Sequence, residues 1–160
     1  MSNPMVIRVL GPSDAGLLRG MLAMFGHAFD DVPTYTHRQP DDGYLQSLLA
    51  SEAFVAVCAL QETTVVGGLA AYVLPKFEQA RSEIYIYDLA VAQAFRRRGV
   101  ATAMIRTLQE LAAARGIGVV FVQADHGDDP AIALYSGLGV REEVLHFDLV
   151  ARGLEAPPTD

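Results

Sequence analysis

The sequence predicts a single domain that contains both helices and strands, of the α/β (α+β) class. About four helices flank a mixed central sheet. The chain has 160 residues, 51% of them hydrophobic, which is enough to form one buried core. Three β-rich runs follow one another between residues 54 and 91, which indicates antiparallel strands. A helical pattern then leads to a further apolar run at 118–124, and a helical crossover is typical of a parallel pair.

A strand and a helix open the chain. Residues 5–10 are β-rich and stop at Gly11-Pro12, a turn signal. Ser13 or Asp14 can then cap a helix that we expect to end near Gly26.

A loop and a second helix come next. Residues 30–40 contain two prolines and little periodicity, which predicts a loop between two helices. Asp41 or Asp42 can cap a short helix that ends at about Ala50. Three strands complete this half of the chain, and they are residues 54–60, 65–74 and 82–91.

A β-α-β crossover follows the third of these strands. Apolar residues recur at helical spacing between residues 101 and 112, and this helix closes at Arg115-Gly116. The run at 118–124 is apolar enough to be a buried strand, and we expect it to lie parallel to 82–91.

The C-terminal region predicts one more helix and one more strand. Asp129-Pro130 is a strong helix start, because a capping acid precedes a proline at the first helical position, and the helix runs to Leu138-Gly139. A last strand covers about residues 141–149, and residues 155–160 are expected to be a frayed tail. No repeat or linker divides the chain, so we expect residues 1–160 to form one domain.

Composition restricts the class of function. The 12 Lys and Arg against 19 Asp and Glu give a net charge of −7, which disfavours non-specific nucleic-acid binding and leaves room for a cationic partner. No apolar run approaches the roughly 20 residues of a membrane span, and the first ten residues lack signal-peptide features, so a cytoplasmic protein is expected. Cys58 lies in an apolar run and is interpreted as a core residue. The four histidines show no ligand spacing, so no metal is predicted, and His146 has no assigned role.

A strand, a basic turn and a helix start combine between residues 84 and 101. The first-turn N–H groups and the positive end of a helix dipole attract phosphate, and small residues at 99 and 101 let the backbone approach it. Cations at a helix N-terminus are unfavourable by roughly 0.3 to 1 kcal/mol each. The three arginines at 96–98 therefore favour a bound anion over a merely solvated helix start.

These residues carry a family resemblance. Arg96-x-x-Gly99-x-Ala101, after Asp88-Leu-Ala-Val91, resembles the Arg/Gln-x-x-Gly-x-Gly/Ala signature of the GNAT superfamily of N-acetyltransferases, and the element order fits that fold over nearly the whole chain. Longer blocks are similar to the gentamicin-type aminoglycoside 3-N-acetyltransferases. The blocks are Met24–Gly26, Ala28–Asp30, Gly67–Tyr72, Lys76–Val91, Phe121–Asp125 and Gly127–Tyr135.

The resemblance implies acetyl-CoA as the co-substrate. It implies a β-bulge near Asp88–Ala90 that splays strand 82–91 from strand 118–124, so that the pantetheine arm fits between them. Backbone groups of Leu89 and Val91 would pair with the arm, and the N–H of Leu89 could polarise the thioester oxygen. The implied cofactor-binding residues are Leu89, Ala90, Val91, Arg96, Arg97, Arg98, Gly99, Val100, Ala101 and Thr102.

The same resemblance implies the acid and base groups. Tyr135 matches the family tyrosine that donates a proton to the departing thiolate, and its alternative reading is a packed core tyrosine. The amine must lose a proton, and Asp88 is the first candidate to accept it, with Glu83 second. Asp88 interrupts an apolar strand at the expected bulge, so its alternative role is to pair with the bulge itself.

Further acids are candidates for binding ammonium groups. Asp125, Asp128 and Asp129 follow the parallel strand, at the edge where open α/β sheets place ligands. Asp129 is expected to cap the next helix, which leaves the other two for a polycation. Asp30 and Asp31 are expected to form the opposite wall, unless they are simply solvated.

The resemblance implies acetyl transfer to an amine of an aminoglycoside, at the 3-amino group, by direct attack in a ternary complex, with antibiotic resistance as the consequence. A polyamine or another small cationic amine is the alternative acceptor. A CoA-binding regulatory module and a protein acetyltransferase remain open, and nucleic-acid binding ranks last. No membrane partner is expected, and a homodimer stays open as an alternative to a monomer.

Overall fold

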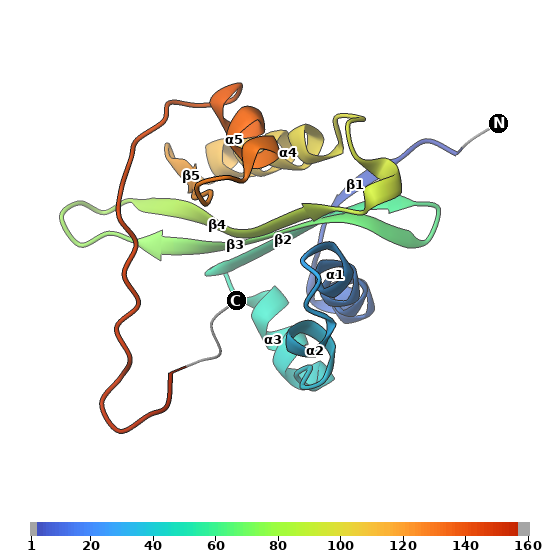
Figure 1. Cartoon of the computed structure of the whole chain (residues 1–160), viewed down its shortest axis with the longest axis horizontal. Helices are drawn as coiled ribbons and strands as arrows, with labels where there is room; N and C mark the ends of the chain where they lie inside the picture. The colour runs from blue at the N-terminus through green and yellow to red at the C-terminus, as the bar shows by residue number, and fades with distance from the viewer. Residues whose placement is uncertain (1–2, 157–160) are drawn as a thin grey trace. The chain divides into compact units, whose positions relative to one another are not determined.

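A five-stranded sheet organises the first part of the chain (Figure 1). The computed structural model describes residues 3–156, and the chain forms two compact units, residues 1–125 and residues 126–160. The first unit contains β1 (Val6–Val9), η1 (Pro12–Asp14), α1 (Ala15–Ala28), α2 (Val32–Thr36), α3 (Asp42–Ala50), β2 (Phe54–Gln61), β3 (Thr64–Pro75), β4 (Ser82–Val91), η2 (Gln93–Phe95), α4 (Val100–Ala114) and β5 (Val120–Val122).

The strand order is β1-β2-β3-β4-β5. The first four strands are antiparallel to their neighbours, and β4 pairs in parallel with β5 through the α4 crossover. The mixed sheet with its parallel pair confirms the predicted fold class. The strand expected at 118–124 shortens to Val120–Val122.

Helices cover both faces of this sheet, with α1, α2 and α3 on one side and α4 on the other (Figure 1). Phe54, Ala56 and Cys58 face α1 and α3, and Cys58 is fully buried as predicted. The intervening Val57 is also fully buried, because β2 is covered on both faces. The helices on the two faces can approach the sheet closely because β3 carries two glycines.

Gly67 and Gly68 provide that close approach. A Cβ at Gly67 would lie 3.1 Å from side-chain atoms of α4, at Met104 and Val100. A Cβ at Gly68 would lie 3.1 Å from Met21 and from Phe25 on α1. The two consecutive residues thus seat one helix on each face, because successive positions of a strand point to opposite sides.

The ladder between β3 and β4 is interrupted once. Ala71 pairs with Ile86, whereas Ala70 pairs with Asp88, so Tyr87 is an extra residue in β4. This is a β-bulge, and it falls directly before the segment Asp88–Ala90 in which one was expected.

The structure corrects the predicted loop at residues 30–40 and confirms the predicted helix cap at Asp41. The segment 30–40 is not entirely a loop, because α2 occupies Val32–Thr36. Asp31 caps this helix by accepting from the N–H of Thr34, and a proline in its first turn favours the helix start. The expected cap at Asp41 is confirmed, since its carboxylate accepts from the N–H of Tyr44 at 2.8 Å.

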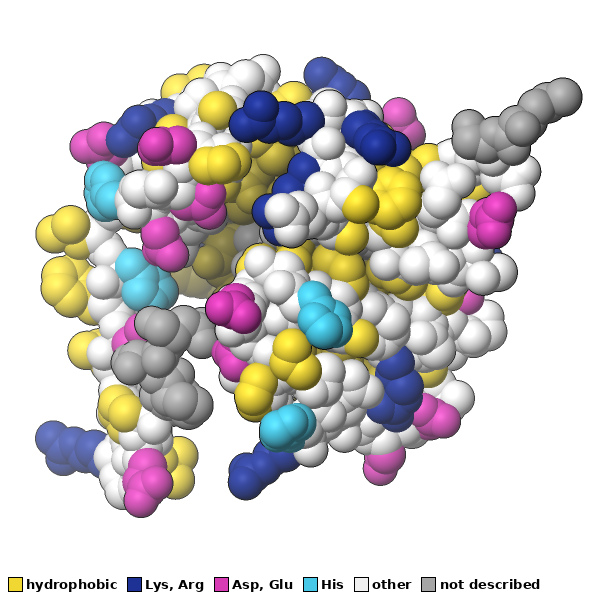
Figure 2. Space-filling view, turned by 45° about the vertical axis from the view of Figure 1, so that its right-hand side comes forward, with side chains coloured by type: hydrophobic (Ala, Val, Ile, Leu, Met, Phe, Trp, Pro, Cys, Tyr) yellow, Lys and Arg dark blue, Asp and Glu magenta, His cyan; other side chains and the backbone are white. Residues whose placement is uncertain are grey.

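The second unit contains α5 (Asp129–Ser136) followed by an extended segment. The strand predicted over residues 141–149 is wrong, because no strand forms in residues 137–156. Val144, Leu145, Phe147 and Leu149 are exposed there, and Figure 2 shows hydrophobic side chains along this segment. An alternating apolar pattern becomes a strand only when its backbone groups pair with a neighbour. The predicted tail at 155–160 lies mostly outside the described residues.

Among residues 3–156, no helix is long and apolar enough to cross a membrane.

Gly68→Val tests the close contact between β3 and α1. We expect it to lower the free energy of unfolding by about 1–3 kcal/mol, because the added carbons collide with Met21 and Phe25. Chemical denaturation measures the change. Gly118→Val is the matched control, since a Cβ there meets no atom within 4 Å. Equal stability of the two variants would contradict the proposed packing.

Candidate functional site

The turn between β4 and α4 has the backbone geometry of an anion site. Arg97 and Gly99 both adopt left-handed backbone conformations, with φ of +61° and +77°. Such residues bend a turn so that its N–H groups converge, and the first-turn N–H groups of α4 follow at once. Apart from its own residue and its two neighbours in the chain, no atom lies within 4 Å of the position that a Cβ of Gly99 would take. The turn is therefore open where a phosphate would approach the backbone.

The arginine side chains partly hold this turn in place. Arg96 donates from Nε to the backbone carbonyl of Val91 at 2.9 Å. The guanidinium of Arg98 lies 5.5 Å from the ring centroid of Phe95. Arg97 is exposed. The basic cluster thus braces the turn to the end of β4 in addition to supplying positive charge.

β4 and β5 separate beyond a short ladder. The ladder runs from Ile84↔Val120 to Ile86↔Val122, while β4 continues to Val91. This divergence agrees with the split that the family resemblance implied.

The bulge sets which backbone groups face the split. Before it, the N–H of Ile84 points to the β5 side, where it donates to Val119. After it, the N–H of Ala92 donates to Val66 beside β3 at 2.8 Å. Because alternate residues of a strand direct their backbone groups to the same edge, Leu89 and Val91 direct theirs to the β5 side. These are the two residues expected to pair with the pantetheine arm.

Asp88 lies on the opposite side of the sheet from α4. The hydroxyl of Tyr35 on α2 donates to Asp88 Oδ1 at 3.4 Å, and Asp88 is partly buried. Burial and the nearby charge of Asp88 raise the pKa values of Tyr72 and Tyr85. The carboxylate therefore lies among tyrosines at the bulge. Its predicted position at the bulge is confirmed, and Tyr35 is a partner that sequence reasoning missed.

Glu83, the second candidate base, has a different environment. Its carboxylate forms an ion pair with Arg81, with Nη1 and Oε1 2.9 Å apart. The ladder places Glu83 opposite Leu74 and Asp88 opposite Ala70, so the two residues lie four β3 positions apart, about 13 Å along the sheet. The two carboxylates therefore do not serve the same reacting amine.

The acids before α2 divide between two roles. Asp31 caps α2. Asp30 is exposed, and its backbone is left-handed with φ of +53°. Both residues belong to the turn that leads to the helix carrying Tyr35. The capping role of Asp31 reduces its freedom to bind a ligand.

In the second unit, Asp128 rather than Asp129 caps α5. Asp128 accepts from the N–H of Ala131 at 3.3 Å, and Asp129 is the first residue of the helix. The cap expected at Asp129 is therefore wrong by one residue. Tyr135 lies in the last turn of α5. Burial, together with the charge of Asp128, raises the pKa of its phenol to about 12. Asp125 is exposed at the end of the first unit.

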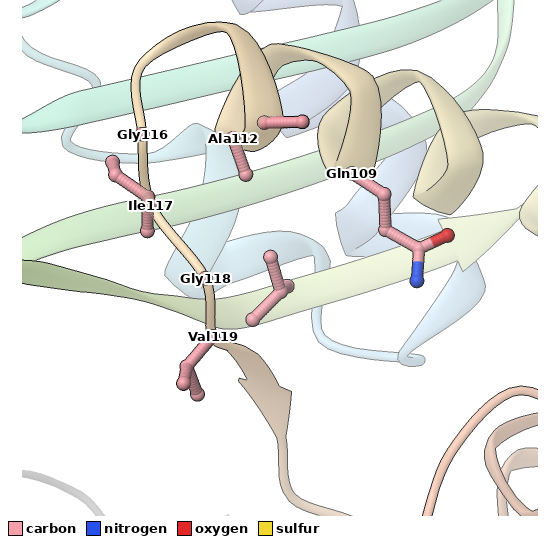
Figure 3. A pocket seen from close by; sticks show the side chains of 8 residues that line it. Gln109, Ala112, Gly116, Ile117, Gly118 and Val119 are labelled. Atoms are coloured by element: carbon pink, nitrogen blue, oxygen red, sulfur yellow. The ribbon is translucent and has the colours of Figure 1, made fainter.

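A shallow pocket lies at the other end of α4 from the basic turn. Figure 3 shows Gln109 and Ala112 of α4 on one wall and Gly116, Ile117 and Gly118 on the connection to β5. Its lining contains no titratable side chain. The pocket therefore offers no group that could move a proton. Within residues 3–156, no three His, Cys, Asp or Glu side chains come together as a metal-binding group.

Known proteins match this arrangement. A crystal structure of an aminoglycoside acetyltransferase from an uncultured soil metagenomic sample is 57% identical, with a TM-score of 0.91 over 93% of this chain and 99% of its own. A second such enzyme from soil, in complex with sisomicin, is 31% identical, with a TM-score of 0.84 over 92% and 97%. AAC(6')-Iy, in complex with a bisubstrate analogue, shares the fold at 16% identity, with a TM-score of 0.73 over 93% and 100%.

None of the curated proteins matches the chain. The model of the acetyltransferase (GNAT) family matches residues 22–140, which include the basic turn and the diverging strand pair. The chain therefore belongs to the GNAT family of acetyltransferases.

Proposed function

We propose that this protein transfers the acetyl group of acetyl-CoA to an amine of an aminoglycoside, at the 3-amino position, and so confers resistance. The observation that carries the proposal is the 57% identity, over nearly the full length of both chains, to an aminoglycoside acetyltransferase. An aminoglycoside acetyltransferase that is 31% identical has been solved in complex with sisomicin and in complex with trehalose. The net charge of −7 suits an acceptor that carries several ammonium groups.

The residues of the basic turn fit the cofactor. Left-handed Gly99 leaves open space, and the first-turn N–H groups of α4 provide donors for a pyrophosphate. Leu89 and Val91 offer backbone groups for the amide-bearing arm, although the carbonyl of Val91 already accepts from Arg96. Acetyl-CoA, when bound, supplies an acetyl group activated as a thioester.

The proton transfers fall to two side chains. Asp88 accepts the proton that the acceptor amine must lose, directly or through one water, and Tyr35 orients its carboxylate. Tyr135 donates a proton to the departing thiolate. With its pKa raised to about 12, the phenol keeps its proton throughout the physiological pH range.

Release of CoA thiol tests the proposal. Gentamicin, kanamycin, spermidine and a lysine-bearing peptide are compared as acceptors at equal acetyl-CoA. We expect efficient turnover with gentamicin and little with spermidine. The reverse result would identify a polyamine acetyltransferase, and product analysis by NMR locates the acetylated amine.

Tyr135→Phe removes the phenolic proton and keeps the ring. We expect kcat to fall about 100-fold, since a positioned acid contributes roughly that much or more, while the Kd for acetyl-CoA stays within about twofold. Tyr44→Phe is the matched control, because Tyr44 is an exposed tyrosine on α3. Wild-type kcat in Tyr135→Phe would remove the proton-donor role.

Asp88→Asn removes the proposed proton acceptor without changing its size. We expect kcat/KM to fall at all pH values and the acid limb of its pH profile to disappear, because an amide cannot bind the proton. Glu83→Gln should leave the profile unchanged, since Glu83 pairs with Arg81. An unaltered profile in Asp88→Asn would make that residue structural.

Gly99→Val strains a left-handed position and fills the space before the helix N-terminus. We expect the Kd for acetyl-CoA, measured by calorimetry, to rise about 100-fold, because the backbone N–H groups are no longer accessible. Gly116→Val is the matched control, since Gly116 is also left-handed, with φ of +70°, at the opposite end of α4. Equal affinities in the two variants would exclude the turn as the pyrophosphate site.

A further inference from the structure

An aromatic row crosses four strands of the first unit. The ladder places Phe54 opposite Tyr72, Tyr72 opposite Tyr85, and Tyr85 opposite Phe121. Tyr85 and Phe121 stack with centroids 4.8 Å apart and rings 4° from parallel. The extra residue at the bulge, Tyr87, contacts both Tyr72 and Tyr85, at 5.8 and 5.6 Å.

Exposure to solvent differs among these rings. Phe54 is 7% exposed beneath the helices, Tyr72 is 39% exposed, and Tyr87 is 63% exposed. The hydroxyl of Tyr85 donates to Gln123 Oε1 at 2.8 Å, which fixes its ring. Tyr85 is partly buried, and we call the three neighbouring tyrosines, Tyr72, Tyr85 and Tyr87, the tyrosine shelf. Its rings are held in place by one another before any ligand arrives.

The shelf adjoins the carboxylate of the proposed reaction. Asp88 follows Tyr87 directly, and its charge contributes to the raised pKa values of Tyr72 and Tyr85. A negative charge beside partly exposed aromatic rings matches a ligand that has both an apolar ring face and ammonium groups. Aromatic faces carry a negative quadrupole, which attracts C–H groups and cations.

We propose that the tyrosine shelf binds the ring face of the acceptor while Asp88 faces its reacting amine. This inference rests on the proposed function and adds a specificity determinant to it. A six-membered ring with equatorial substituents presents axial C–H groups to the shelf, whereas a linear polyamine has no such face. The shelf therefore selects cyclic over acyclic polycations, which charge alone does not do.

A purely structural role makes a different prediction. Cross-strand aromatic pairs also stabilise sheets, and in that case removing a ring lowers stability rather than acceptor affinity. Tyr87 separates the two roles, because it is the most exposed ring of the shelf and its loss removes less buried surface than the loss of Tyr72.

The test compares Tyr87→Leu with Tyr87→Phe in the full chain loaded with CoA. Calorimetry gives the Kd of gentamicin and of spermidine. We expect Tyr87→Leu to weaken gentamicin about two- to tenfold and spermidine less than twofold, since an aromatic contact is worth roughly that factor. Tyr87→Phe keeps the ring and should bind gentamicin like wild type. Phe77→Leu is the control, because Phe77 is a fully exposed aromatic residue of the same hairpin.

The outcomes separate this inference from the proposed function. Unchanged gentamicin affinity in Tyr87→Leu, or equal losses for gentamicin and spermidine, overturns the shelf even when wild type acetylates gentamicin. Loss of affinity in Tyr87→Leu with recovery in Tyr87→Phe supports the shelf even when wild type binds gentamicin without acetylating it. Wild type that does not bind gentamicin overturns both.

Discussion

The extra residue in β4 at Tyr87 determines which way the following side chains and backbone groups face. Ile84 and Ile86 lie buried on the side of the sheet that α4 covers. With strict alternation, Asp88 would follow them into that apolar layer, where an unpaired carboxylate costs several kcal/mol or becomes neutral. The bulge places Tyr87 and Asp88 on the opposite side instead, within reach of Tyr35. One inserted residue thus converts a core position into a candidate catalytic one.

The same inserted residue connects the two halves of the site. Because it changes the alternation, Leu89 and Val91 direct their backbone groups toward the side where β5 has already diverged. The carbonyl of Val91 accepts from Arg96, which ties the strand end to the turn before α4. A single strand, β4, therefore carries both sets of groups. The proposed cofactor-binding groups lie along its β5 edge, and the proposed acceptor-binding side chains project from its face. A change in the register of β4 would disturb both together.

Sequence patterns predicted the first unit well, because most of its elements are specified locally. The strands of the meander, the α4 helix and the Asp41 cap follow from periodicity and capping chemistry. Tyr35 was missed because its short helix lies in a segment that reads as a loop, and its bond to Asp88 joins residues 53 positions apart. The strand expected at 141–149 failed for the related reason that pairing needs a partner that local pattern does not supply.

Charge and shape contribute to acceptor recognition over different distances. Attraction between exposed carboxylates, such as Asp30, and ammonium groups is screened beyond about 8 Å at physiological ionic strength. Such acids speed the encounter with any polycation and discriminate weakly among them. Discrimination requires contacts that act at van der Waals distance, and the proposed tyrosine shelf beside Asp88 would supply contacts of that kind. The bulge brings the charged group and the aromatic ring together. The residue that it inserts is Tyr87, and the residue whose side chain it moves to the other face of the sheet is Asp88.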